Sequence, residues 1–170
     1  MNEKLKGITN TALFVAVITV ISQIAIPMPS LVPITLQTFA ICLTGYFLGF
    51  KTGGCAILVY VLLGAMGAPV FSSFQGGFSV ILSHGGGFIV GFIPLALLCG
   101  ASKKRPVAIA FGCFGILICH LMGIIWYMVI TKNPFIPSFV LVSLPYVFKD
   151  IALCVLAYFV SEKIKTKIKK

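Results

Sequence analysis

Acidic residues are almost absent from this chain. Only three of its 170 residues are Asp or Glu, and charged residues of both signs make up 9%. Hydrophobic residues make up 59%, and the mean hydropathy is +1.13. A soluble domain of this size has too little interior to bury so much apolar surface. The composition therefore excludes an ordinary soluble fold and indicates an integral membrane protein.

One carboxylate stands apart from the other two. Between Glu3 and Glu162 the chain has a single acidic side chain, Asp150, and it lies inside the last long apolar run, residues 138–160. A carboxylate at the centre of a membrane helix costs about 2.5 to 3.5 kcal/mol, so such a residue usually faces a cavity, a partner or a substrate. Asp150 is therefore the first candidate for a functional residue.

Residues for hydrolytic or metal chemistry are also scarce. Histidine occurs twice, as His84 and His120. With one membrane carboxylate, they do not make up a three-ligand zinc site, so we expect no metal. His120 is expected to be a packed or hydrogen-bonded interior residue, and His84 a loop residue near a pocket. A triad of Ser83, His84 and Asp150 can be drawn, but nothing in the sequence links its members.

Motifs for nucleotides and disulfides are missing as well. The glycine-rich segments complete neither a P-loop nor a dinucleotide-binding pattern, so we expect a non-enzymatic protein without a cofactor of its own. No Cys-x-x-Cys pair occurs, and the cysteines are predicted to be small packing residues inside or beside apolar runs rather than disulfide or zinc ligands. They are Cys42, Cys55, Cys99, Cys113, Cys119 and Cys154.

The apolar runs predict an all-α integral membrane protein, a bundle of six transmembrane helices in a single domain, residues 1–170. A bilayer core takes about 20 helical residues per crossing. The expected spans are residues 8–25, 36–50, 52–67, 86–101, 106–130 and 139–161. The second and third are short for a full crossing, so they must tilt little or lie where protein replaces lipid. A β-barrel is not favoured, because the runs do not alternate in polarity.

The basic residues predict the orientation. With six spans, every lysine and arginine falls at one face of the membrane except Lys132 and Lys149. The positive-inside rule then places both termini in the cytoplasm of a prokaryotic cell. A cleaved signal peptide is the alternative for the first run, but no small-x-small site follows it, so we expect it to be retained. The net charge of +10 reflects topology and not nucleic-acid binding, since the cations lie in scattered short loops.

Two uncharged segments are expected on the opposite, outward face. Residues 26–37 contain three prolines, and residues 67–87 contain six glycines. Such irregular backbone cannot face lipid, because its amide and carbonyl groups would lack hydrogen-bond partners there. It must rest on protein, water or a ligand. The two segments therefore predict a lidded pocket that is entered from outside and that takes a small, largely apolar ligand.

Several motifs resemble those of the BioY family. They are Pro33-x-Thr35-Leu-Gln-Thr38 with Gly45 and Gly49, Leu-Leu-Gly-Ala-Met-Gly-Ala-Pro-Val-Phe at 62–71, Gly-Gly-Phe at 76–78 and Gly-Gly-Phe-Ile-Val-Gly-Phe at 86–92. The resemblance covers about residues 8–162. BioY proteins are the biotin-binding S components of energy-coupling factor (ECF) transporters.

The resemblance implies a six-helix bundle that captures biotin from the outer face of the cell membrane. Delivery to the cytoplasm would need a transmembrane coupling subunit and two ATPases, which hydrolyse the ATP. Small residues on the first helix serve the coupling interface in such proteins, and the matching positions are Ala12 and Ala16; ordinary packing within the chain is an equal alternative. A stand-alone, ion-coupled vitamin transporter that works through Asp150 is the competing function.

The resemblance also assigns a role to Asp150, whose carboxylate would accept a hydrogen bond from a ureido N–H of biotin. Family members often have a lysine three residues later, where this chain has Leu153, and Lys149 precedes the aspartate instead. Consecutive helix residues point about 100° apart, so Lys149 replaces that lysine only if Pro145 distorts the helix.

The remaining site candidates are polar or aromatic residues of the outer segments. Gln37 and Thr35 would either bind the ligand or cap the second span. Aromatic residues would surround the apolar rings of the ligand, and glycines would allow close backbone approach. The full candidate set is Asp150, Gln37, Thr35, Ser73, Gln75, Gly76, Gly77, Phe71, Phe74, Gly86, Gly87, His84, Tyr146 and Lys149.

Overall fold

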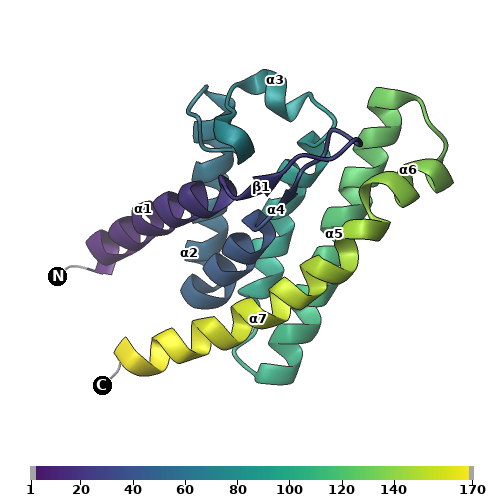
Figure 1. The fold of residues 1–170 in the computed structure, drawn as a ribbon. Coiled ribbons are helices and arrows are strands. Elements are labelled where there is room, and N and C mark those ends of the chain that lie inside the picture. The colour runs from purple at the N-terminus through teal and green to yellow at the C-terminus, as the bar shows by residue number, and fades with distance from the viewer. Residues whose placement is uncertain (1–2, 169–170) are drawn as a thin grey trace.

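A computed structural model describes residues 3–168, and these residues are almost entirely helical (Figure 1). The longer helices are α1 (Glu3–Ser22), α2 (Gln37–Ala65), α4 (Gly86–Cys99), α5 (Arg105–Thr131) and α7 (Leu144–Ile168). The shorter elements are α3 (Phe78–Ile81), α6 (Phe135–Val142), a 3₁₀ turn at Ser72–Phe74, and the strands β1 (Ala25–Ile26) and β2 (Ile34–Thr35). The prediction of an all-α protein is therefore confirmed apart from one short antiparallel hairpin, which pairs Ala25 with Thr35.

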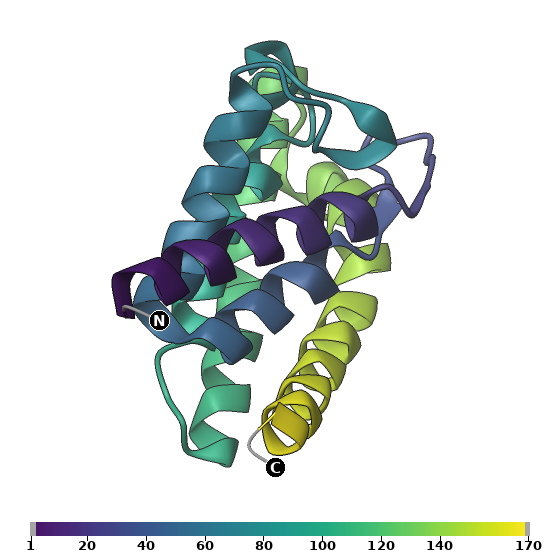
Figure 2. The ribbon, with the colours of Figure 1, turned by 90° about the vertical axis from the view of Figure 1, so that its left-hand side faces the viewer.

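Four helices, α1, α2, α5 and α7, are long and apolar enough to cross a membrane, and α4 is a shorter apolar helix. Three predicted runs, 8–25, 86–101 and 106–130, correspond to α1, α4 and α5 with shifted ends. The runs 36–50 and 52–67 both lie in α2, which is not one regular helix. Gly49 has φ 80° and ψ 178°, a conformation open to glycine but strained for other residues. The chain changes direction sharply at this point (Figure 2).

The last predicted run, 139–161, is divided between two helices. Ser143 has non-helical dihedral angles and separates α6 from α7. Pro145 occupies the first turn of α7, where its missing N–H leaves no helical hydrogen bond unmade. The predicted local distortion by Pro145 therefore takes the form of a new helix start, five residues before Asp150.

Glycines allow the central helices to pack closely. Gly45 of α2 lies against the backbone of Ala96 in α4, and Gly91 of α4 lies against Cys119 of α5. A Cβ atom at Gly87 would meet the backbone and side chains of α5. Small-residue packing is thus found at Gly45, Gly87 and Gly91. Gly49 differs, because it provides the bend and a Cβ atom built on it would meet nothing within 4 Å.

The chain has two distinct ends. The start of α1, the bend of α2, the α4–α5 connection and the end of α7 lie toward one end of the molecule (Figures 1 and 2). The β1–β2 hairpin, α3 and the α5–α6 connection lie toward the other. Large apolar side chains such as Val20, Val129, Ile136 and Phe148 are at least 70% exposed on the outer helix faces. An apolar solvent is the natural environment for such a surface.

Candidate functional site

A cavity opens beneath the hairpin end, where α2, α4, α5 and α7 approach one another. It encloses about 790 Å³ of space empty of protein atoms, with its mouth included. One wall is apolar and is formed by Phe88, Ile89, Phe92, Ile116 and Val142. The polar lining residues include Thr35, Gln37, Gln75, His120, Tyr146, Lys149 and Asp150.

Asp150 contributes a buried carboxylate to this cavity, and its side chain is only 8% exposed. Oδ2 lies 3.2 Å from Nε2 of His120. Oδ1 lies 2.6 Å from Nζ of Lys149 but makes no hydrogen bond of proper geometry with any described residue. A buried carboxylate needs both a counter-charge and hydrogen-bond donors. Lys149 supplies the charge, and Oδ1 is buried without a well-aligned donor among residues 3–168.

Lys149 reaches Asp150 although the two residues are consecutive in α7. Its Nζ also donates to the carbonyl oxygen of Thr35, at 2.9 Å, in strand β2. The long side chain therefore curves over the start of α7 and ties the hairpin to the helix. The 100° between neighbouring helix residues does not keep Lys149 away from Asp150, because the lysine side chain is long enough to reach the carboxylate.

His120 is a site residue that the sequence did not reveal. It lies in the middle of α5, is 4% exposed, and lines the cavity. Its Nδ1 is 2.9 Å from Oγ of Ser143, and its Nε2 faces Asp150. The ring thus links the carboxylate to the α6–α7 break. The prediction that His120 is an interior, hydrogen-bonded residue is confirmed. Its contact with Asp150 could not be predicted, because no sequence spacing relates residue 120 to residue 150.

The full chain, residues 1–170, matches the model of the BioY family. The chain belongs to the BioY family. It is 36% identical over 162 residues to the probable biotin transporter BioY of Pyrococcus horikoshii, covering 95% of this chain and 98% of that protein. It is 36% identical over 168 residues to the biotin transporter BioY of Thermotoga maritima, covering 95% and 96%.

The fold is similar to a crystal structure described as the S-component for biotin from an ECF-type ABC transporter. The TM-score is 0.85 at 24% identity, covering 98% of this chain and 95% of that one. Together with the four span-length helices, these relatives make this BioY family member a multi-pass membrane protein.

Half of the predicted site residues of this BioY family member line the cavity: Asp150, Lys149, Gln37, Thr35, Gln75, Phe71 and Tyr146. Thr35 and Gln37 lie where the first outer segment meets the cavity, at the start of α2. Oγ1 of Thr35 accepts from the backbone N–H of Gln37 at the start of α2. Nε2 of Gln37 donates to the hydroxyl of Tyr60 at 2.7 Å, and both Thr35 and Gln37 face the cavity.

Tyr146 holds the first outer segment over the cavity. Its hydroxyl donates to the carbonyl oxygen of Val32 at 2.7 Å and lies 3.0 Å from Oγ of Ser30. Leu31, between these two residues, has a positive φ of 62° and is 68% exposed. The proline-rich segment therefore rests on α7 through one buried phenol, as the prediction of a supported loop required.

The second outer segment is tied to α1 and α2. The backbone N–H of Phe74 donates to Oε1 of Gln23 at 2.7 Å, just beyond α1. The ring of Phe71 packs edge-on against Tyr60, with centroids 5.6 Å apart, and fills the space that a side chain at Gly64 would need. Phe71 is therefore an aromatic wall of the cavity that also anchors the segment.

Other predicted residues lie outside the cavity lining. His84 packs against Tyr127, with ring centroids 5.7 Å apart, and its neighbours Ser83 and Gly85 reach the cavity instead. Phe74 is 71% exposed. The remaining members of this group are Ser73, Gly76, Gly77, Gly86 and Gly87, which shape the turns and the close contacts of the outer segments.

Proposed function

We propose that this chain is a biotin-binding S component, which captures biotin at the outer face of the cell membrane and delivers it to the cytoplasm with an ECF module. Its family and its fold support the proposal. The observation that carries it is the buried Oδ1 of Asp150, which lacks a well-aligned donor and belongs to a residue that lines a cavity with an apolar wall. Biotin has a polar part and an apolar part that match this site, since its ureido group carries N–H donors and its thiophane ring and alkyl chain are apolar.

In this proposal the ureido group of biotin meets Asp150 and its partners. Oδ1 accepts a ureido N–H, a charge-assisted bond that is stronger than one between neutral groups. Lys149 and His120 contact the carboxylate and hold it in place. The bicyclic ring and the chain of biotin then lie against Phe88, Phe92 and their neighbours, which exclude water.

The proposed topology has six crossings, in which the two halves of α2 count separately and α6 and α7 together form the last. The lysine-rich end of α7 and the basic α4–α5 connection then face the cytoplasm, as the positive-inside rule requires. The cavity lies toward the opposite, outer end. The last turn of α7, with Lys165 and Lys167, meets anionic lipid headgroups at the inner surface.

The proposed partners are a transmembrane coupling subunit and two ATP-hydrolysing subunits. Ala12 and Ala16 are both exposed on α1, and Ala12 lines a shallow apolar groove between α1 and the second half of α2. Small exposed side chains allow a partner helix to approach closely. No nucleic acid and no cofactor of its own enter this function.

Two measurements test the proposal and separate it from the ion-coupled alternative. Mass spectrometry of small molecules released from the purified protein is expected to detect biotin. Reconstituted liposomes are expected to accumulate labelled biotin only when the coupling subunit and ATPases are present with ATP. Uptake driven by an ion gradient alone would favour the stand-alone transporter, and chemical conversion of the bound molecule would reveal an enzyme.

A further inference from the structure

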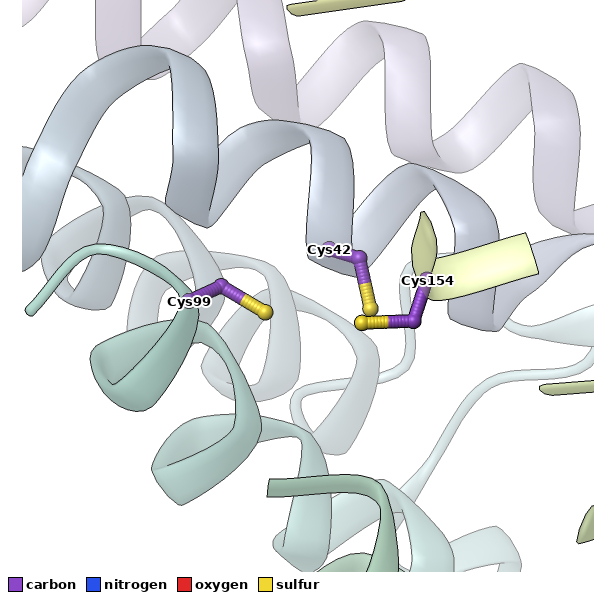
Figure 3. A group of neighbouring side chains, drawn as sticks. All are labelled: Cys42, Cys99 and Cys154. Atoms are coloured by element: carbon purple, nitrogen blue, oxygen red, sulfur yellow. The ribbon is translucent and has the colours of Figure 1, made fainter. Parts of the chain in front are cut away.

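Three cysteines from distant parts of the chain meet in the interior. Cys42 of α2, Cys99 of α4 and Cys154 of α7 point toward a common centre (Figure 3). Their Sγ atoms all lie within 4.8 Å of one another, and each residue is 0% exposed. All six cysteines of the chain are free thiols. The sequence prediction that these cysteines only fill space did not anticipate this convergence.

The spacing of the three sulfur atoms suits a metal ion. Metal–sulfur bonds of about 2.3 Å from a central ion place sulfur atoms roughly 3.8 to 4.0 Å apart. Sulfur atoms within 4.8 Å reach this arrangement by small side-chain rotations.

The donor set selects the type of ion. Thiolate sulfur is a soft ligand that favours Cu⁺ and Zn²⁺. Structural zinc is almost always bound by four ligands, whereas this group of metal-ligating side chains has three members among residues 3–168. One cysteine thiolate with two neutral cysteine thiols balances the charge of Cu⁺, so the occupied site carries no net charge in the apolar core. We propose that Cys42, Cys99 and Cys154 form a binding site for one Cu⁺ ion.

One hydrogen-bond donor lies beside the cluster. The hydroxyl of Tyr46 lies 3.2 Å from Sγ of Cys154 and can donate to it once that sulfur is a thiolate. The thiolate that forms releases one proton to solvent, so binding is favoured at higher pH. Cys154 also lies four residues after Asp150, on the same face of α7. A bound ion would therefore fix the helix that carries Asp150 to α2 and α4 below the cavity.

The site is tested on the full-length protein in detergent, under anaerobic conditions, by titration with Cu⁺ against a competing Cu⁺ chelator. We expect one Cu⁺ per chain and an X-ray absorption spectrum with three sulfur neighbours and no oxygen or nitrogen ligand. Cys42→Ser, Cys99→Ser and Cys154→Ser are each expected to weaken binding at least about tenfold. Cys113→Ser is the matched control, because Cys113 lies half-buried on α5 outside the cluster and should leave binding unchanged.

Thermal unfolding gives a second readout. Cu⁺ should raise the melting temperature of the wild type and of Cys113→Ser but not that of Cys154→Ser, because an ion that binds only the folded state stabilises it. Binding of Zn²⁺ in preference to Cu⁺, fewer than three sulfur neighbours, or equal copper binding by Cys154→Ser would overturn the proposal. The wild-type spectrum decides the question even if a serine variant fails to fold.

Discussion

At the scale of single residues, the site depends on which groups balance the charge and the hydrogen bonding of one buried carboxylate. Asp150 has a lysine on one side and a histidine on the other, yet one of its oxygens lacks a well-aligned donor. Removing one member of a buried ion pair leaves the other uncompensated, which costs more than the pair contributes. Substitutions at Asp150 should therefore affect both binding and stability, and the two effects need separate measurements.

Asp150→Asn keeps the size of the side chain but removes its charge. A hydrogen bond to a charged group contributes about 1.5 to 3 kcal/mol, so we expect biotin affinity to fall roughly 10- to 100-fold. Isothermal titration calorimetry with the purified protein measures this change. Glu162→Gln is the control, because Glu162 is an exposed carboxylate of the same helix and pairs with Lys165 at the surface. Equal affinity of wild type and Asp150→Asn would remove the basis of the binding mode.

His120 is expected to act through Asp150. In a double-mutant cycle of His120→Gln and Asp150→Asn, the effects on biotin affinity should be non-additive by about 0.5 to 3 kcal/mol, as is typical of residues in direct contact. His84→Gln, which changes a ring packed on Tyr127, should combine additively with Asp150→Asn. Additivity in the first cycle would mean that the 3.2 Å contact between His120 and Asp150 does not position the carboxylate.

At the scale of the elements, apolarity predicts where helices form but not where they turn. Helix α5 follows the predicted run 106–130 closely, because nothing interrupts that run. The predicted boundary between the second and third spans is Lys51, whereas the backbone changes direction two residues earlier, at Gly49. The contacts of Lys149 and His120 could not be predicted, since they depend on the route of the β1–β2 hairpin and on the placement of α5 against α7.

Gly49 is the element-scale residue whose replacement tests this description. Its positive φ strains any residue with a Cβ atom, although nothing lies within 4 Å to clash with one. We expect Gly49→Ala to lower the free energy of unfolding by about 1 to 3 kcal/mol. Thermal unfolding in detergent would then show a lower melting temperature. Gly7→Ala is the matched control, since Gly7 is helical, equally unobstructed and has no positive φ, so it should be neutral or stabilising.

At the scale of the whole molecule, charge and irregular backbone are separated to opposite ends. The basic residues of the α4–α5 connection and the end of α7 lie far from the uncharged hairpin and glycine-rich segment (Figures 1 and 2). Between these two ends of the molecule, the exposed side chains are largely apolar. From this arrangement we predict a single orientation in a bilayer, with the cavity on the side that the positive-inside rule assigns to the exterior.

The orientation can be measured with two exposed positions at opposite ends. Ser79 lies in α3 near the cavity, and Ala101 lies in the α4–α5 connection. In a Cys55→Ser background, which removes the one exposed native thiol, a membrane-impermeant maleimide should label Ser79→Cys in intact cells. Ala101→Cys should react only after the cells are broken, because it faces the cytoplasm beside the basic residues 103–105. The reverse pattern would place the cavity inside the cell, and a subunit that captures its ligand from outside would then be impossible. Labelling of both variants in intact cells would instead exclude a single orientation, because a fixed topology exposes only one of these ends to the medium.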